Sequence, residues 1–204
     1  MPLHIAMRTN NLLRGRTMAG SLHLTKNLPP LTLIIGGARS GKSALAERLA
    51  TGTGLIRHYV ATAEAWDTEM AERIGRHKVD RGADWITTET PRDLVGVLKE
   101  VPKGQVVLID CATLWLTNLL LAEADIAAES ARLLEALQTC RVPVVVVSNE
   151  VGWGIVPENA LARAFRDHQG RLNQLLAASA GLVIAVVAGL PMVLKGVLPK
   201  SFGP

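Results

Sequence analysis

Aromatic residues are scarce in this sequence: Phe, Trp and Tyr make up only 3% of its 204 residues. Proteins that bind single-stranded nucleic acid stack bases on aromatic side chains, so this scarcity disfavours that class. Only two cysteines are present, Cys111 and Cys140, with no CxxC pair, which excludes a disulfide scaffold. We expect both to be reduced core residues, which predicts a cytoplasmic protein. The longest apolar run, residues 182–194, is shorter than the roughly 18 residues of a membrane span.

The sequence is rich in aliphatic residues and carries a basic charge. Hydrophobic residues make up 49% of the chain, enough for the core of one domain of this length. The net charge of +4 has two interpretations: a basic surface for nucleic acid, or a few Lys and Arg side chains that hold a small anionic ligand. The scarcity of aromatic residues favours the small anion.

The first thirty residues differ from the rest of the chain. Residues 1–26 contain Lys and Arg but no acidic residue, and they show neither clear periodicity nor the apolar core of a secretory signal. A transit peptide and a flexible extension both fit this composition. We expect a basic, flexible extension over residues 1–30, followed by one domain over residues 31–204.

Strand and helix patterns alternate along the rest of the chain. Short apolar runs predict strands at 31–35, 55–61, 85–88, 105–109, 142–147, 182–187 and 192–195. Helical periodicity predicts helices at 44–51, 67–81, 91–100, 114–121 and 127–140, and a long helix capped by Asn159. This alternation predicts an α/β fold like that of P-loop NTPases, with a mostly parallel central sheet and helices on both faces.

A phosphate-binding loop is the clearest motif. Residues 36–43 read GGARSGKS, which matches G-x-x-x-x-G-K-[ST] between a predicted strand and a predicted helix. Main-chain N–H groups in such a loop point at phosphate oxygens, and the helix N-terminus adds its positive dipole end. Lys42 is the expected catalytic contact to the β- and γ-phosphates, and the Ser43 hydroxyl the expected Mg²⁺ ligand. The expected nucleotide-binding residues of this loop are Gly36, Gly37, Ala38, Arg39, Ser40, Gly41, Lys42 and Ser43.

Asp110 follows the apolar run at residues 106–109. An acidic residue at the carboxyl end of a neighbouring parallel strand is the usual second Mg²⁺ partner beside a phosphate loop. Because helix follows, Asp110 could instead be a helix N-cap. We favour the metal role and keep the capping role as the alternative.

His77 lies among the cations Arg73, Arg76, Lys78 and Arg81. Like-charge repulsion in such a cluster favours the neutral, nucleophilic imidazole. Taken alone, a histidine among surface cations is more commonly part of a solvated helix face. The residues by themselves leave both interpretations open.

Five segments together resemble one enzyme family. They are GGARSGKS at 36–43, YVATAEAWDTEMAERIGRHK at 59–78, ADW at 83–85, VLIDCATLWLTNLL at 107–120, and the stretch from VSNEVGWGIVPEN to the end of the long helix at 147–180. In this order and spacing the chain resembles the bifunctional adenosylcobinamide kinase and adenosylcobinamide-phosphate guanylyltransferase of cobalamin biosynthesis.

The resemblance implies two reactions on one chain. The first phosphorylates adenosylcobinamide with GTP or ATP, and the second transfers GMP from GTP to that phosphate. The second runs through a guanylylated histidine, which corresponds to His77 and makes it the expected catalytic nucleophile. The resemblance also implies a homo-oligomer, a trimer, with the active site near a subunit boundary. Further nucleotide contacts that it implies are Thr62, Ala63, Glu64, Lys78, Val79, Asp80, Arg81, Glu89 and Asp110.

Two other functions fit a phosphate loop. Another small-molecule kinase would use the loop without covalent chemistry at His77, and a nucleotide-dependent switch would hydrolyse GTP slowly without a small-molecule acceptor. Trp153, between two glycines, is expected either to line a corrinoid pocket or to anchor its loop. The spacing of the long helix predicts one inward face formed by Leu161, Phe165, His168, Leu172 and Leu175. His168 is expected at the edge of the core because it has helical spacing with Phe165 and Leu172.

Overall fold

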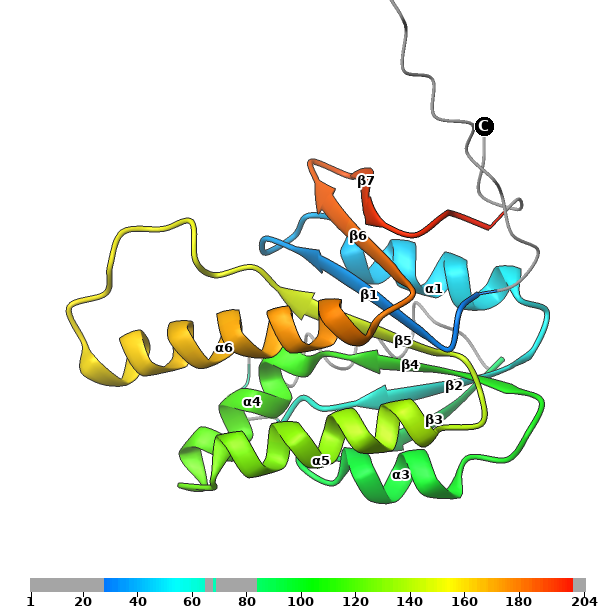
Figure 1. Cartoon of the computed structure of the whole chain (residues 1–204), viewed down its shortest axis with the longest axis horizontal. Helices are drawn as coiled ribbons and strands as arrows, with labels where there is room; N and C mark the ends of the chain where they lie inside the picture. The colour runs from blue at the N-terminus through cyan, green and yellow to red at the C-terminus, as the bar shows by residue number, and fades with distance from the viewer. Residues whose placement is uncertain (1–27, 65–67, 69–83, 200–204) are drawn as a thin grey trace, which may run out of the picture.

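The computed structural model describes residues 28–64, 68 and 84–199. Their strands form one seven-stranded sheet in the order β3-β2-β4-β5-β1-β6-β7 (Figure 1). The strands are β1 (Leu31–Gly36), β2 (Ile56–Ala61), β3 (Trp85–Glu89), β4 (Gln105–Asp110), β5 (Val144–Asn149), β6 (Leu182–Val187) and β7 (Leu190–Lys195). The described helices are α1 (Lys42–Gly52), α3 (Leu94–Glu100), α4 (Ala112–Leu121), α5 (Ile126–Thr139) and α6 (Ala160–Ser179).

The helices begin where short polar side chains satisfy free main-chain N–H groups. Asp93 accepts a hydrogen bond from Gly96 N at the start of α3, and Asp125 accepts one from Ala128 N at the start of α5. Asn159 accepts bonds from the first turn of α6, which confirms the cap expected there. A capping side chain of this kind stabilises a helix by about 1 kcal/mol, so these residues set where the helices start.

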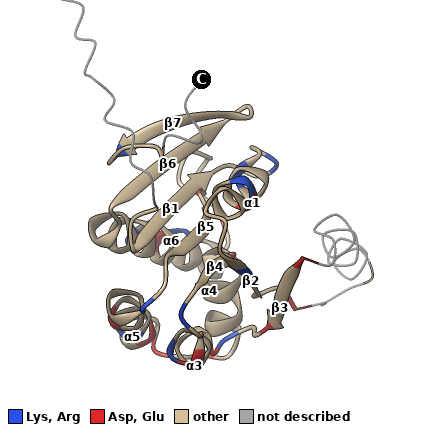
Figure 2. Cartoon of the chain, turned by 90° about the vertical axis from the view of Figure 1, so that its right-hand side faces the viewer, with Lys and Arg blue, Asp and Glu red and all other residues tan. Residues whose placement is uncertain are grey.

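The core has two layers, one on each face of the sheet. On one face, α1 packs Leu45, Ala46 and Leu49 onto alternate strand residues. On the opposite face, α3, α4, α5 and α6 cover the other set of strand residues, with Trp115 of α4 fully enclosed. Figures 1 and 2 show α1 alone on its side among the described helices. Since strand side chains alternate between faces, the layer that a strand residue joins shows on which face it lies.

The observed sheet confirms the expected α/β architecture with helices on both faces. All neighbouring strand pairs from β3 to β6 are parallel, and only β7 runs antiparallel to its neighbour β6. The short strand expected at residues 85–88 is present as β3. Of the helix expected at 67–81, only Thr68 is among the described residues, so this expectation is not tested.

Two expectations needed correction. The buried face of α6 is Gln169, Leu172, Asn173 and Leu176, whereas the expected apolar face included Leu161 and Leu175, which are both exposed. Polar side chains occupy the inward positions because Gln169 and Asn173 hydrogen-bond to each other and to Ser148 of β5. His168 is half-buried, as expected at the core edge.

The second correction concerns where the domain starts. Leu28 is buried in the core layer beneath α1, and Pro30 O accepts a hydrogen bond from Val144 N at 2.9 Å. Residues 28–30 therefore belong to the packed domain and not to the extension expected over residues 1–30. No described helix is long and apolar enough to cross a membrane.

Candidate active site at the carboxyl end of the sheet

The phosphate loop leaves the carboxyl end of β1 and enters α1 at Lys42. Gly36 is buried, and a Cβ there would lie 2.5 Å from Val186 O and 2.6 Å from Ser40 Oγ, so only glycine fits. Gly41, the N-cap of α1, has a φ of 94°, in the left-handed region that favours glycine. The two glycines thus fix how the chain turns from strand to helix.

The groups that could hold phosphate lie within this turn. Lys42 is largely buried and its Nζ donates to Gly37 O at 3.0 Å, which folds the side chain back over the loop. The first turn of α1 has no acidic residue and no capping side chain, so its main-chain N–H groups remain for an anion. Ser40 Oγ is buried without a hydrogen-bond partner in the described structure. An unsatisfied buried hydroxyl is costly, and a phosphate oxygen would satisfy it.

The turn between β6 and β7 closes over the phosphate loop. Gly189 N donates to Ser40 O at 2.9 Å, and Gly189 Cα lies 3.4 Å from where a Gly41 Cβ would sit. This contact fixes the loop from the side of the antiparallel hairpin. It joins two segments almost 150 residues apart in the chain, which the sequence patterns did not predict.

Asp110 stands at the carboxyl end of β4, where its Oδ2 accepts a hydrogen bond from Tyr59 OH at 3.1 Å. Asp110 pairs in register with Ala61 of β2, which pairs with Glu89 of β3. The alternative capping role is wrong, because the N-cap of α4 is Cys111. The carboxylates of Asp110 and Glu89 therefore stand at the same end of the sheet as the phosphate loop.

The donor set fits a nucleotide-bound Mg²⁺. Among the described residues no group of three or more His, Cys, Asp or Glu side chains could hold an ion by itself. Mg²⁺ in nucleotide enzymes commonly takes only one or two protein oxygens, and phosphates and waters supply the rest. Ser43, in the first turn of α1, and Asp110 provide a hydroxyl and a carboxylate of this kind.

Thr62 ties the end of β2 to the end of β4. Its side chain is fully enclosed, and its Oγ1 donates to Cys111 O and accepts from Cys111 N, both at 2.8 Å. Asn118 Nδ2 donates to Thr62 O at 2.8 Å. Thr62 therefore positions the chain, whereas Ala63 and Glu64 after it are half-exposed at the site.

The described residues include only part of the expected site. The phosphate loop, Thr62 to Glu64, Glu89 and Asp110 all gather at the carboxyl end of the sheet. His77 and residues 78–81 lie outside the described residues. Trp153 is 84% exposed, so it does not anchor its loop against the described part of the chain.

Burial changes the acidity of the cysteine beside Asp110. Desolvation, and secondarily the negative charge of Asp110, raises the pKa of the Cys111 thiol to about 11. Both cysteines are free, and Cys140 is only partly buried. Cys111 is therefore a packing residue and not a nucleophile at neutral pH.

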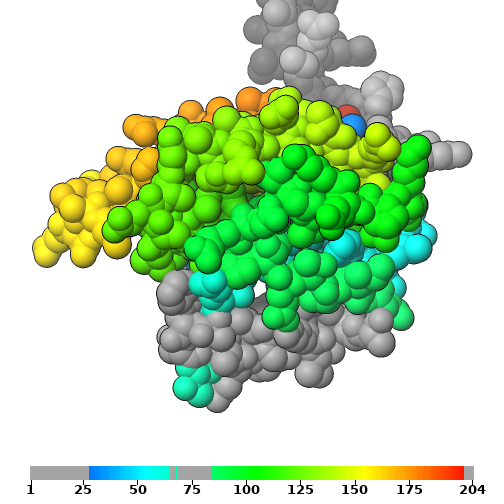
Figure 3. Space-filling model, turned by 90° about the horizontal axis from the view of Figure 1, so that it is seen from below, coloured from blue at the N-terminus to red at the C-terminus, as the bar shows by residue number. Residues whose placement is uncertain are grey.

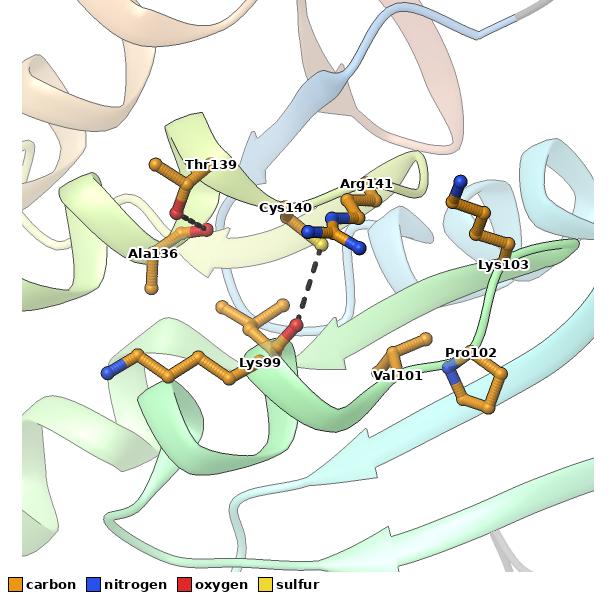
Figure 4. Close-up of a pocket in the computed structure, with 9 residues that line it drawn as sticks. Lys99, Val101, Pro102, Lys103, Ala136, Thr139, Cys140 and Arg141 are labelled. Carbon is orange, nitrogen blue, oxygen red and sulfur yellow. Dashed lines mark hydrogen bonds between the residues drawn. The ribbon is translucent and has the colours of Figure 1, made fainter.

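A hollow lies at the opposite end of the sheet from the phosphate loop. Its volume is about 450 Å³. It lies between the ends of α3 and α5, which pack side by side on the face seen in Figure 3, and Figure 4 shows the side chains that line it. Its lining includes Lys99, Lys103 and Arg141, close to the ends of helices where cations complement the helix dipole. These cations come before β4 and β5 in the chain, which places them at the amino end of the parallel strands. The phosphate loop follows β1 at the carboxyl end, so this hollow is separate from the nucleotide site.

Comparison with known proteins gives a family that fits this site. Residues 32–194 match the family model described as "Cobinamide kinase / cobinamide phosphate guanyltransferase". The chain is 48% identical over 167 residues to the bifunctional adenosylcobalamin biosynthesis protein CobP of Pseudomonas aeruginosa, covering 80% of this chain and 96% of that protein. It is 41% identical over 181 residues to the bifunctional adenosylcobalamin biosynthesis protein CobU of Escherichia coli, covering 81% and 99%.

Among solved structures, the flagellar accessory protein FlaH of Methanocaldococcus jannaschii matches with a TM-score of 0.46 and 18% identity, covering 84% of this chain and 80% of that one. That likeness is too distant to bear on function. The family match spans nearly the whole described domain, including the phosphate loop and Asp110. This chain belongs to the cobinamide kinase / cobinamide phosphate guanyltransferase family.

Proposed function

We propose that this chain phosphorylates adenosylcobinamide with GTP or ATP and then transfers GMP from GTP to the product, giving adenosylcobinamide-GDP and pyrophosphate. The observation that carries the proposal is the phosphate loop at the carboxyl end of the sheet within a chain of this family. Both reactions use the phosphates of a nucleoside triphosphate, which agrees with a single triphosphate-binding loop.

The phosphoryl transfer needs charge stabilisation around the γ-phosphate more than covalent help from the protein. The N–H groups at the start of α1 and the Lys42 ammonium would bind the phosphate oxygens. Ser43 and Asp110 would hold Mg²⁺, which when bound neutralises part of the phosphate charge. Tyr59 would orient Asp110 through the hydrogen bond that it donates to that carboxylate.

The guanylyl transfer is proposed to run through His77. Its ring nitrogen would attack the α-phosphorus of GTP, the bond from that phosphorus to the bridging oxygen would break, and pyrophosphate would leave. A phosphate oxygen of adenosylcobinamide phosphate would then attack the same phosphorus and release the histidine. The cationic neighbours of His77 in the sequence support the proposal, because they would stabilise the charge of this transition state.

Labelling with GTP that carries radioactive α-phosphate tests this mechanism. Incubation with Mg²⁺ should leave label on the protein that acid releases and alkali does not, as a phosphoramidate requires. The His77→Ala variant should take up no label, whereas the control His168→Ala should label like the wild type. Label that persists in His77→Ala would contradict the covalent role of His77.

Turnover with adenosylcobinamide separates this function from its alternatives. The proposed enzyme makes adenosylcobinamide phosphate and then the GDP derivative. Phosphorylation without GMP transfer would indicate another kind of small-molecule kinase. Slow GTP hydrolysis that ignores the corrinoid would indicate a nucleotide switch.

We further propose that the chain is a cytoplasmic homo-oligomer, a trimer. The loop between β5 and α6 exposes Trp153, Ile155 and Val156 by 84%, 96% and 59%, and clustered large apolar side chains are typical of surfaces that bind a partner. The free cysteines support a reducing compartment such as the cytoplasm. Analytical ultracentrifugation at working concentration should give three times the chain mass, and a monomer would contradict this proposal.

A further inference from the structure

Asn149 is the last residue of β5, the strand between β4 and β1. In the parallel register Asn149 pairs with Gly36, the first residue of the phosphate loop. On its other side, Asp110 pairs with Val147, two residues before Asn149. Asn149 therefore stands at the carboxyl end of the sheet, with the phosphate loop on one side and the proposed magnesium carboxylate on the other.

The alternation of β5 shows which face the Asn149 side chain occupies. Val145 and Val147 pack in the core layer under α1, whereas Ser148 bonds to Asn173 of α6 on the opposite face. Asn149 therefore lies on the α1 face. Leu108 of β4 packs in the same layer, which places Asp110 on this face too.

The main chain at Asn149 is held from two directions. Asn149 N donates to Thr113 Oγ1 at 2.7 Å, and Asn149 O accepts from Asn173 Nδ2 at 3.0 Å. Asn173 is itself fixed by the buried side chains of Ser148 and Gln169, with donor–acceptor distances of 2.6 and 3.0 Å. These hydrogen bonds hold the main chain at the end of β5 from the sides of α4 and α6.

The side chain of Asn149 takes no part in this network. Its carboxamide has no hydrogen bond to any of the described residues, and the residue as a whole is half-buried. An amide held rigidly by its main chain but left without a side-chain partner, on the face where the helix N-terminus binds phosphate, is placed to bind a ligand.

We propose that the Asn149 carboxamide donates a hydrogen bond to the γ-phosphate of the bound triphosphate and stabilises the phosphoryl group as it transfers. This inference rests on the proposed function. In that step the acceptor hydroxyl oxygen bonds to the γ-phosphorus, the bond to the β–γ bridging oxygen breaks, and the hydroxyl proton is released. Asn149 exchanges no proton, because a carboxamide does not titrate, and it acts through charge stabilisation alone.

The test compares Asn149→Ala and Asn149→Asp with the control Gln138→Ala, which removes an exposed amide from α5. We expect Asn149→Ala to lower kcat for phosphoryl transfer about 100-fold, the usual effect of losing one donor to a developing anion. GDP has no γ-phosphate, so its affinity should stay within about twofold of the wild type, whereas GTP should bind at least about tenfold more weakly. Asn149→Asp keeps the side-chain shape but adds a negative charge. It should therefore weaken GTP binding more than Asn149→Ala does.

Two results would overturn the inference. One is a kcat for Asn149→Ala within about threefold of the wild type. The other is an equal loss of GDP and GTP affinity, which would indicate a general disturbance of the loop. Calorimetric titration with both nucleotides, carried out in the His77→Ala background and without adenosylcobinamide, measures binding without turnover. If the wild type fails to phosphorylate adenosylcobinamide while Asn149→Ala still weakens GTP alone, the proposed substrate is wrong and the γ-phosphate contact stands.

Discussion

Replacing Gly36 with Ala tests the packing that shapes the phosphate loop. The new Cβ would lie 2.5 Å from Val186 O and 2.6 Å from Ser40 Oγ, closer than real Cβ contacts come. Val186 O belongs to the main chain of β6, which pairs with β1 along its length, so the neighbour cannot move away without disturbing the sheet. Forcing a methyl group into a packed interior costs typically about 1–3 kcal/mol.

Gly37→Ala is the matched control, because a Cβ there meets nothing within 4 Å. Each Gly→Ala change also reduces the entropy of the unfolded chain, which stabilises a compatible site by about 0.4–1 kcal/mol. Gly36→Ala and Gly37→Ala both include this entropy contribution, so it cancels when the two variants are compared. We therefore expect Gly36→Ala to have a free energy of unfolding about 1–3 kcal/mol below that of Gly37→Ala.

Urea denaturation followed by circular dichroism measures this difference, provided that both variants unfold with the same dependence on urea. Equal midpoints for Gly36→Ala and Gly37→Ala would refute the argument that the contact with Val186 O demands glycine. Because the loop must shift to relieve the contact, Gly36→Ala should also bind GTP more weakly than the wild type.

Three further predictions concern single side chains. The Lys42→Ala variant removes the ammonium and should weaken GTP binding by about 10–100-fold, because a hydrogen bond to a charged group is worth roughly 1.5–3 kcal/mol. Unchanged GTP affinity in a titration would exclude Lys42 as a phosphate contact. Burial lowers the pKa of His58, and the hydrogen bond to Gln105 opposes this effect only in part. Below about pH 6.5 the unfolded chain therefore binds a proton at His58, whereas the folded chain resists protonation there. Wild-type stability should therefore fall as the pH drops below that value, and a His58→Gln variant that shows the same fall would contradict this. Since burial raises the pKa of Cys111 to about 11, iodoacetamide at pH 8 should alkylate Cys140 first, as peptide mass spectrometry would show.

Much of the fold could be predicted from the sequence because its elements are locally encoded. The runs at β4, β5 and β6 are apolar on both faces, as a covered parallel sheet requires. Helix starts were less accurate: α3 begins at Leu94, three residues after the predicted start at Pro91, because Asp93 provides the cap. The face of α6 was partly wrong, since its polar residues Gln169 and Asn173 bond to one another and to Ser148 in the interior.

The site was predictable wherever a motif carried it. The phosphate loop has a spacing that the chemistry of phosphate binding dictates, and Asp110 has a place at a strand end that parallel topology dictates. Tyr59, Asn149 and Gly189 were not singled out as site residues, because each reaches the site only through strand order or a long-range contact. The role of His77 stays a prediction.

The sequence by itself determined the local chemistry of this protein: a glycine-rich turn that binds phosphate, the alternation of strands and helices, and the family of the chain. Only the tertiary structure decided which strand ends are neighbours. β5 lies between β4 and β1, and this order brings Asn149 beside Gly36 and near Asp110. The physical reason is that strand order depends on how helices pack across the whole sheet, whereas a phosphate loop depends on eight consecutive residues.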